Sequence, residues 1–181
     1  MVSDTQPQQT SDAHRKVDEA HRQVDRVVSG LLEAGRSLAC AESLTGGRLA
    51  ATVVDVPGAS AVFRGGAVTY ATDTKATVLD VPVRLLTDRG PVDPEVAVAM
   101  ASGAASLFGA DLGVATTGVA GPDQQDGVAV GTVFTAVVDT VSGVSIVRGQ
   151  SLTGDRTSIR QQSVELALAM ILEALAEPQP A

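Results

Sequence analysis

Residues 37–48 decide the fold and have the sequence SLACAESLTGGR. Residues 37–42 are small and mostly apolar, a composition typical of a short buried strand, and a turn with two adjacent glycines follows over residues 43–47. A helix is expected from about Arg48. A buried strand that leads through a glycine-rich turn into a helix is a typical unit of an α/β domain, so the stretch predicts a sheet covered by helices.

The segments on either side extend this pattern. Upstream, apolar residues recur at helical spacing from Asp12 to Gly35, which predicts an amphipathic helix that ends at Gly35. Downstream, the expected elements are a strand at 67–70, a short helix from 72, a helix from an Asp93 cap to Gly109, a strand at 112–117, two strands at 130–139 and 144–151 that pair as an antiparallel hairpin, and a helix from an Asp155 cap to 175.

These elements predict one α/β domain over residues 12–176, built as a three-layer α/β/α sandwich with a mixed, mostly parallel central sheet. Residues 1–11 and 177–181 are polar and rich in Pro and Gln, so we predict disordered tails there. The 181 residues suffice for one full core. Because 44% of the residues are hydrophobic and only 2% aromatic, that core must consist of Val, Ala, Leu and Ile.

Composition also narrows the classes of function. A formal net charge of −8 would repel phosphate backbones, so nucleic acid is not expected as a partner. Cys40 is the only cysteine, which excludes an internal disulfide and fits a reducing compartment. No apolar run reaches the ~18 residues of a membrane span, and the N-terminus has no signal-peptide pattern. We therefore expect a cytoplasmic protein with no membrane partner.

Histidine is confined to the first predicted helix. His14 and His21 are the only two, and two ligands without a carboxylate cluster are too few for a metal site, so no metal is predicted. Without histidine in the body of the domain, a Ser-His-Asp triad and a Cys-His pair around Cys40 are both disfavoured. Cys40 is interpreted as a small core residue.

Two glycine-rich loops follow buried strands. In the first, Ser43 precedes Gly46 and Gly47, where free N–H groups of a helix start could hold an oxyanion or a phosphate; the alternative is a serine that only caps the helix. The second loop, residues 116–127, would face the same cleft because ligands bind beyond the carboxyl ends of strands. It matches neither the Walker pattern nor the dinucleotide fingerprint, which disfavours an ATPase or a Rossmann oxidoreductase.

With no histidine available, Lys75 is the natural base for Ser43. Lysine acts as a base only where burial or a cationic neighbour lowers its pKa, and the alternative is a solvated helix lysine.

Five ordered motifs then point to a family: AESLTGG, GG-VTYAT--K, PEVA-AMA, TGVAGP----G--VGTV and GDR--IR. Over about residues 24–175 they resemble the C-terminal domain family of the competence/damage-inducible protein CinA, whose stand-alone members are nicotinamide-nucleotide amidohydrolases. The resemblance implies an α/β/α sandwich. It also implies deamidation of a small-molecule substrate, nicotinamide mononucleotide, to nicotinate mononucleotide and ammonia in pyridine nucleotide recycling, without a cofactor.

The resemblance assigns roles to individual residues. Ser43 would be the nucleophile and Lys75 the base, hydrogen-bonded directly or through Tyr70 as the third catalytic residue. Backbone N–H groups around residues 45–47 would stabilise the oxyanion, and Arg156 would face an anionic group. The substrate-binding residues would be Glu42, Thr45, Gly46, Gly47, Thr117, Gly118, Gly121 and Arg156.

The sequence departs from the family pattern in one loop. Gln124-Gln125 and Val128-Ala129 stand where members often carry Gly-Gly and Lys-Pro, and the altered loop from Asp123 to Ala129 is expected to shape the pocket. The larger N-terminal domain of two-domain relatives has no counterpart, so we expect no pyrophosphatase activity of that domain.

Two other classes of function stay open. One is a nucleotide-binding module that has lost catalysis, and the other is an interaction protein in competence or DNA damage, acting through a protein partner because its acidity weighs against DNA contact. We also expect a homo-oligomer, because small α/β domains rich in Val and Ala commonly cover leftover apolar surface by symmetric pairing.

Overall fold

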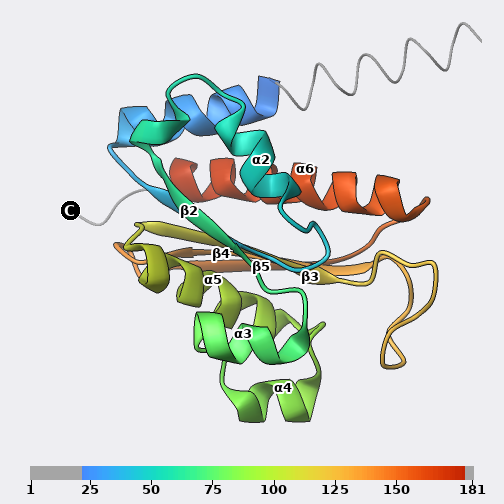
Figure 1. Ribbon diagram of the computed structural model, residues 1–181. Coiled ribbons are helices and arrows are strands. Elements are labelled where there is room, and N and C mark those ends of the chain that lie inside the picture. The colour runs from blue at the N-terminus through green and yellow to red at the C-terminus, as the bar shows by residue number, and fades with distance from the viewer. Residues whose placement is uncertain (1–21, 178–181) are drawn as a thin grey trace, which may run out of the picture.

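The computed structural model describes residues 22–177 and has a central sheet between two layers of helices (Figure 1). The sheet order is β2-β1-β3-β4-β5. The strands are β1 (Leu38–Glu42), β2 (Phe63–Val68), β3 (Leu112–Gly118), β4 (Thr132–Asp139) and β5 (Ser145–Ser151). β1 pairs in parallel with β2 and β3, whereas β4 pairs antiparallel with β3 and β5. Only β4 therefore runs against the other strands, which confirms a mixed sheet.

Helices cover both faces of the sheet (Figure 1). One face carries the helix over residues 22–34, α2 (Arg48–Val54) and α6 (Arg156–Ala176). The other face carries α3 (Thr72–Leu79), α4 (Val83–Arg89) and α5 (Pro94–Phe108), and a short 3-10 helix, η1 (Ala59–Ala61), precedes β2. The predicted three-layer sandwich is confirmed.

The two faces of the sheet bury different cores because successive strand residues point to opposite sides. In β1, Leu38 and Cys40 join the larger core under α2 and α6, while Ala39 and Ala41 join the core under α5. Small residues let α5 lie close to the sheet: a Cβ at Gly113 would come within 2.0 Å of the Ala101 carbonyl oxygen.

Several element ends follow from local sequence. The Asp93 side chain accepts a hydrogen bond from the Glu95 N–H at the start of α5, and the Asp155 side chain accepts one from the Ser158 N–H at the start of α6, as the caps predict. Gly109 ends α5 in the left-handed region at φ 60°. The predicted hairpin is confirmed as β4 and β5.

The prediction for β2 was wrong at both ends, because the strand runs from Phe63 to Val68 rather than over 67–70. Gly65 and Gly66 break the apolar pattern by which a strand is recognised. The tertiary structure explains both glycines: a Cβ at Gly66 would lie 2.6 Å from the Cys40 Sγ, and one at Gly65 would lie 2.8 Å from the Phe108 ring. The short α4 was not predicted, since its seven residues mix polar and apolar side chains.

Some predictions lie partly or wholly outside the described residues. The first predicted helix is described from residue 22 and ends at residue 34, just before Gly35. His14, His21, the predicted tail 1–11 and residues 178–181 lie outside. Within residues 22–177, no helix has both the length and the apolar character needed to cross a membrane.

The strand register brings three connections to one edge of the sheet. Glu42, the last residue of β1, lies beside Val68 in β2 and beside Thr116 near the end of β3. Because these strands are parallel, the segments that follow them emerge side by side. This edge is where the sequence places its candidate site.

Candidate active site

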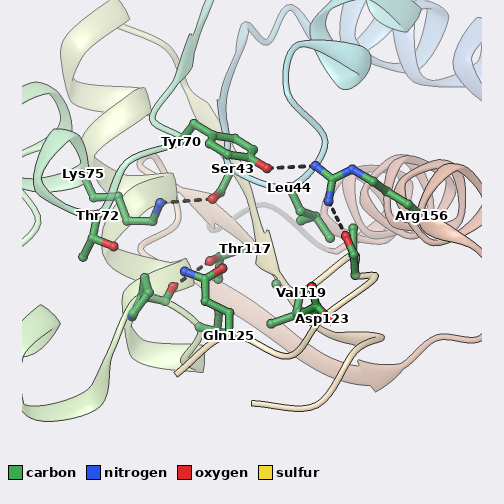
Figure 2. A pocket seen from close by; sticks show the side chains of 15 residues that line it. Ser43, Leu44, Tyr70, Thr72, Lys75, Thr117, Val119, Asp123, Gln125 and Arg156 are labelled. Carbon is green, nitrogen blue, oxygen red and sulfur yellow. Dashed lines mark hydrogen bonds between the residues drawn. The ribbon is translucent and has the colours of Figure 1, made fainter. Parts of the chain in front are cut away.

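A pocket of about 120 Å³ opens at this edge (Figure 2). It is lined by the β1–α2 turn, the β2–α3 connection, α3, the α4–α5 connection, the end of β3 with the β3–β4 loop, and the N-terminus of α6. The predicted site residues that line it are Ser43, Tyr70, Lys75, Thr117, Gly118, Gly121 and Arg156. The structure thus brings together residues that are more than 110 positions apart in the chain.

Ser43 and Lys75 form a direct pair. The Lys75 Nζ lies 3.1 Å from the Ser43 Oγ and donates a second hydrogen bond, 2.6 Å long, to the Thr69 carbonyl oxygen. Lys75 is only 1% exposed, and no carboxylate among residues 22–177 forms an ion pair with it. Burial lowers the pKa of Lys75 from 10.5 to about 8. The alternative of a solvated helix lysine is therefore wrong.

The Ser43 hydroxyl does not cap the following helix. Gly47 is the N-cap residue of α2 and no side-chain cap is formed there. The Ser43 N–H continues the sheet by donating to the Thr116 carbonyl oxygen at 3.0 Å. The serine therefore ends the strand with its hydroxyl at Lys75, where it can act as a nucleophile.

Glu42 caps the helix instead. Its carboxylate is buried and accepts hydrogen bonds from the N–H groups of Gly47, Leu49 and Ala50 at 2.9, 3.1 and 2.8 Å. A carboxylate from the protein itself thus occupies the position at which a helix N-terminus would hold a substrate anion. The structure contradicts the prediction that Glu42 binds substrate, and it makes this residue part of the scaffold.

The predicted oxyanion site over residues 45–47 is also contradicted. The Gly46 N–H donates to the Ser43 carbonyl oxygen at 3.1 Å, and the Gly47 N–H is held by Glu42. The Thr45 side chain is buried and hydrogen-bonded to the Thr116 hydroxyl at 2.7 Å. None of these three residues lines the pocket.

The N–H of Leu44 remains as a backbone donor next to the nucleophile. Leu44 lines the pocket, and its N–H has no hydrogen-bond partner within residues 22–177. The C=O and N–H of a trans peptide unit point in opposite directions. Since the Ser43 carbonyl points into the turn toward the Gly46 N–H, the Leu44 N–H points out of the turn. A donor directly after the nucleophile is a common oxyanion group.

Tyr70 and Arg156 lie at the pocket rim rather than at the nucleophile. The Arg156 Nη2 donates to the Tyr70 hydroxyl at 2.9 Å, and its Nη1 donates to the Gly121 carbonyl oxygen at 2.6 Å (Figure 2). Tyr70 is 60% exposed and has no hydrogen bond to Ser43 or Lys75. Of the two arrangements left open by the sequence, the direct Ser43–Lys75 bond is the observed one.

The end of β3 and the β3–β4 loop line another side of the pocket. The Thr117 hydroxyl donates to the Pro91 carbonyl oxygen at 2.6 Å, so it is already used. Gly118 is needed for close packing, because a Cβ there would lie 2.6 Å from the Thr132 carbonyl oxygen. Gly121, at φ 82°, places its carbonyl oxygen on Arg156.

Gln125 and Asp123 also line the pocket, and neither was predicted individually. Gln125 and Val128 are joined by two backbone hydrogen bonds of 3.2 and 2.8 Å around Asp126 and Gly127, both at positive φ. This is the geometry that an Asp-Gly pair favours in a tight hairpin turn, so the pair was the available signal. In Figure 2 the Gln125 side chain points into the pocket.

Arg160 is a second residue that sequence reasoning missed. It extends from α6 to the β1–α2 turn, where its Nε donates to the Leu44 carbonyl oxygen at 2.8 Å and its Nη2 to the Thr45 carbonyl oxygen at 2.6 Å. Its only sequence signal is the last position of the GDR--IR motif.

The described residues offer no cluster for a metal ion: within 22–177, no three His, Cys, Asp or Glu side chains gather closely enough. Cys40 is buried with its Sγ 3.7 Å from the Glu42 carboxylate. Burial, and then the negative charge of Glu42, raise the pKa of the Cys40 thiol. The thiol therefore stays protonated, as expected of a core residue.

Known proteins match most of this chain. The family model described as "CinA C-terminal domain" matches residues 20–175. A CinA-like protein of Frankia casuarinae is 47% identical over 84% of this chain and 35% of its own length. A putative competence-damage inducible protein of Halalkalibacterium halodurans is 39% identical over 84% of this chain and 36% of its own length.

A crystal structure from the competence-damaged protein (CinA) superfamily, from Klebsiella pneumoniae, has a TM-score of 0.83 at 34% identity. It covers 87% of this chain and 98% of its own. The chain thus spans about a third of the length of the curated relatives it matches and nearly the whole of this solved relative.

Proposed function

Because the chain belongs to the CinA C-terminal domain family, we propose that it is an amidohydrolase that deamidates nicotinamide mononucleotide with Ser43 as its nucleophile. The observation that carries the proposal is the direct contact between the Ser43 hydroxyl and a buried lysine whose pKa is about 8. A serine is a weak nucleophile until a neighbouring base takes its proton. A lysine with this pKa is neutral often enough near pH 7 to serve as that base.

The acylation half begins when neutral Lys75 accepts the proton of the Ser43 hydroxyl. The Ser43 oxygen bonds to the carboxamide carbon, and the carbonyl oxygen becomes an oxyanion that the Leu44 N–H stabilises. The C–N bond then breaks, and the lysine ammonium returns the proton to the departing nitrogen, which leaves as ammonia. The hydrogen bond to the Thr69 carbonyl oxygen keeps the Lys75 Nζ in place through both transfers.

The deacylation half uses the same groups. Lys75, neutral again, takes a proton from water, and the hydroxide bonds to the acyl carbon. The Ser43 oxygen leaves and recovers a proton from Lys75. The products are nicotinate mononucleotide and free enzyme, so the balance is one carboxamide plus one water to one carboxylate, ammonia and the accompanying proton.

The size and charges of the pocket support a substrate that enters with its amide end first. About 120 Å³ is small beside the ~300–1,000 Å³ of sites that enclose a drug-sized ligand. The ring and its carboxamide would occupy the pocket, and the ribose phosphate would lie at the rim. Arg156 is a cation at that rim and would meet the phosphate. The exposed ring of Tyr70 offers a face for the cationic pyridinium.

Ammonia release tests the proposal. The wild type and Ser43→Ala are assayed against nicotinamide mononucleotide, the riboside and free nicotinamide. We expect release from the mononucleotide by the wild type alone, with less from the other two substrates. Equal release by Ser43→Ala would refute the serine mechanism.

The same assay separates a second candidate, a nucleotide-binding module without catalysis. The observation that favours it is the loop over residues 123–129, whose sequence differs from the family pattern and whose Asp123 and Gln125 line the pocket. A module of this kind would raise its melting temperature with the mononucleotide and release no ammonia. Cytoplasmic location and self-association stay predictions.

A further inference from the structure

The β1–α2 turn, residues 43–47, carries both the nucleophile and the Leu44 N–H. Hydrogen bonds within the turn and from two side chains outside it, Glu42 and Arg160, hold its backbone. Glu42 takes the Gly47 N–H, and the Gly46 N–H stays inside the turn on the Ser43 carbonyl oxygen. The carbonyl oxygens of Leu44 and Thr45 accept hydrogen bonds from the Arg160 guanidinium, and the Thr45 oxygen also accepts one from the Arg48 N–H at 3.3 Å.

Arg160 binds these two successive carbonyls with two different nitrogens. The Nε contact is 2.8 Å and the Nη2 contact is 2.6 Å. A guanidinium is planar, so two such bonds fix the relative orientation of the two peptide units as well as their positions. Lysine, with a single nitrogen on a flexible stem, cannot reproduce this fork.

The consequence for Leu44 is that both of its flanking peptide units are held. The Ser43–Leu44 unit is held by the Gly46 N–H, and the Leu44–Thr45 unit is held by Arg160. Releasing either unit would let the Leu44 N–H turn away from the pocket. Because the Ser43 hydroxyl is one residue away, the same release would loosen its contact with Lys75.

The surroundings of Arg160 show that this arrangement is unfavourable for the cation itself. Burial, and then the positive charges of Arg48 and Arg156, lower the pKa of Arg160. No carboxylate among the described residues lies within ion-pair distance of it. Gly46 is also adapted to the contact, since a Cβ there would lie 3.0 Å from the Arg160 Nη2.

We propose that Arg160 is a positioning residue for the nucleophile: it holds the Leu44 and Thr45 carbonyls so that the Ser43 hydroxyl stays on Lys75 and the Leu44 N–H faces the reacting carbonyl. The catalytic part of this inference rests on the proposed function. The structural part, the holding of the turn, does not.

Arg160→Gln and Arg160→Lys test the inference, with Arg148→Gln as the matched control. Arg148 lies in β5 and forms a 2.6 Å ion pair with Glu173 of α6. Its substitution also removes one positive charge, but at a position outside the pocket. The first measurement is amide hydrogen exchange, which needs no substrate. In Arg160→Gln, exchange of the two hydrogen-bonded N–H groups of the turn, those of Gly46 and Gly47, should rise by about tenfold or more over the wild type, and the core strands should be unchanged.

The second measurement is the kinetics of ammonia release from nicotinamide mononucleotide. A small misplacement of reacting groups lowers turnover strongly, so kcat should fall by roughly 10- to 100-fold while KM stays within about threefold. The acid limb of the pH profile, set by Lys75, should not move. Arg160→Lys should recover part of kcat, because it keeps one carbonyl contact.

Turn exchange equal to that of Arg148→Gln, with unchanged kcat, would overturn the proposal. Faster exchange throughout the protein in both Arg160 variants would also overturn it, because Arg160 would then support the whole fold. If the wild type released no ammonia, the proposed function would be refuted, but the structural role of Arg160 would not. The exchange measurement would then decide by itself whether Arg160 holds the turn.

Discussion

Replacing Lys75 with methionine is expected to lower activity strongly and at the same time to stabilise the protein. Methionine has a similar length and fits a buried site without a charge. At pH 7 an amine of pKa about 8 is neutral in about one molecule in ten, whereas one of pKa 10.5 is neutral in only about one in 3,000. At pH 7 the neutral fraction of Lys75 is thus roughly 300 times that of a lysine with the ordinary pKa of 10.5. Its loss should lower kcat/KM by about 10²- to 10⁴-fold.

The sign of the stability effect follows from the same pKa. Below pH 8 the folded protein holds a charged ammonium that burial disfavours, and the lowered pKa corresponds to about 3 kcal/mol at about 1.4 kcal/mol per pKa unit. Removing the amine also leaves the Thr69 carbonyl oxygen without its donor, which costs about 1–2 kcal/mol. Lys75→Met should therefore unfold with a free energy about 1–2 kcal/mol higher at pH 7.

The pH dependence separates this cause from better packing. In the wild type the unfavourable burial is present in full below pH 8 and is relieved as the pH rises toward 10.5, since the unfolded state then holds more protons than the folded one. The advantage of Lys75→Met should shrink over this window and reverse above it, because the cost of about 1–2 kcal/mol for the unpaired Thr69 carbonyl oxygen remains in the variant. Wild-type kcat/KM should rise about tenfold per pH unit up to about pH 8 and then level off.

Urea denaturation at pH 7 and at alkaline pH measures the free energy of unfolding, and ammonia release from pH 6 to 9.5 measures the pH dependence of kcat/KM. Arg84→Met is the control, because Arg84 lies on the surface of α4 with its side chain 92% exposed and should change neither quantity. The reasoning would be refuted if Lys75→Met were less stable than the wild type at pH 7, or if its kcat/KM kept the acid limb of the wild-type pH profile.

Three further outcomes are expected. Ser43→Ala should lose ammonia release by more than about 10³-fold, with stability within about 0.5 kcal/mol by urea denaturation, since Lys75 is the only hydrogen-bond partner of its hydroxyl among residues 22–177. The double variant Ser43→Ala/Lys75→Met should be scarcely worse than either single one, and additive losses would show that the two residues act independently. Glu42→Gln should lower the free energy of unfolding by about 2–3 kcal/mol, because an amide cannot accept all three helix N–H groups. A loss below about 0.5 kcal/mol in the same measurement would contradict the role of Glu42 as the helix cap. Arg156→Ala should raise KM for the mononucleotide about tenfold and leave the riboside unchanged, whereas equal losses on both substrates would make Arg156 structural.

The sequence by itself determined the order of most elements and the position of Ser43 at the end of a strand. Asp93 and Asp155 cap their helices and Gly109 ends one, because caps depend on the local chain and are legible in it. The placement of Ser43 at a strand end follows in the same way from residues next to it. Lys75 as its partner could be named only by elimination and by resemblance, since the burial that lowers its pKa comes from distant segments.

Only the tertiary structure decided which groups of the β1–α2 turn are available to a substrate. From the sequence, the turn looked like an oxyanion site because two glycines precede a helix start, whose first N–H groups have no partner within the helix. In the folded protein the Glu42 carboxylate binds the N–H groups at the helix start, and Arg160, more than a hundred residues away, binds the Leu44 and Thr45 carbonyls. Leu44 is the residue after Ser43 that lines the pocket, so we propose its N–H as the donor. The reason is physical: each polar group binds whatever the packed chain brings within about 3 Å, and sequence spacing does not encode those distances.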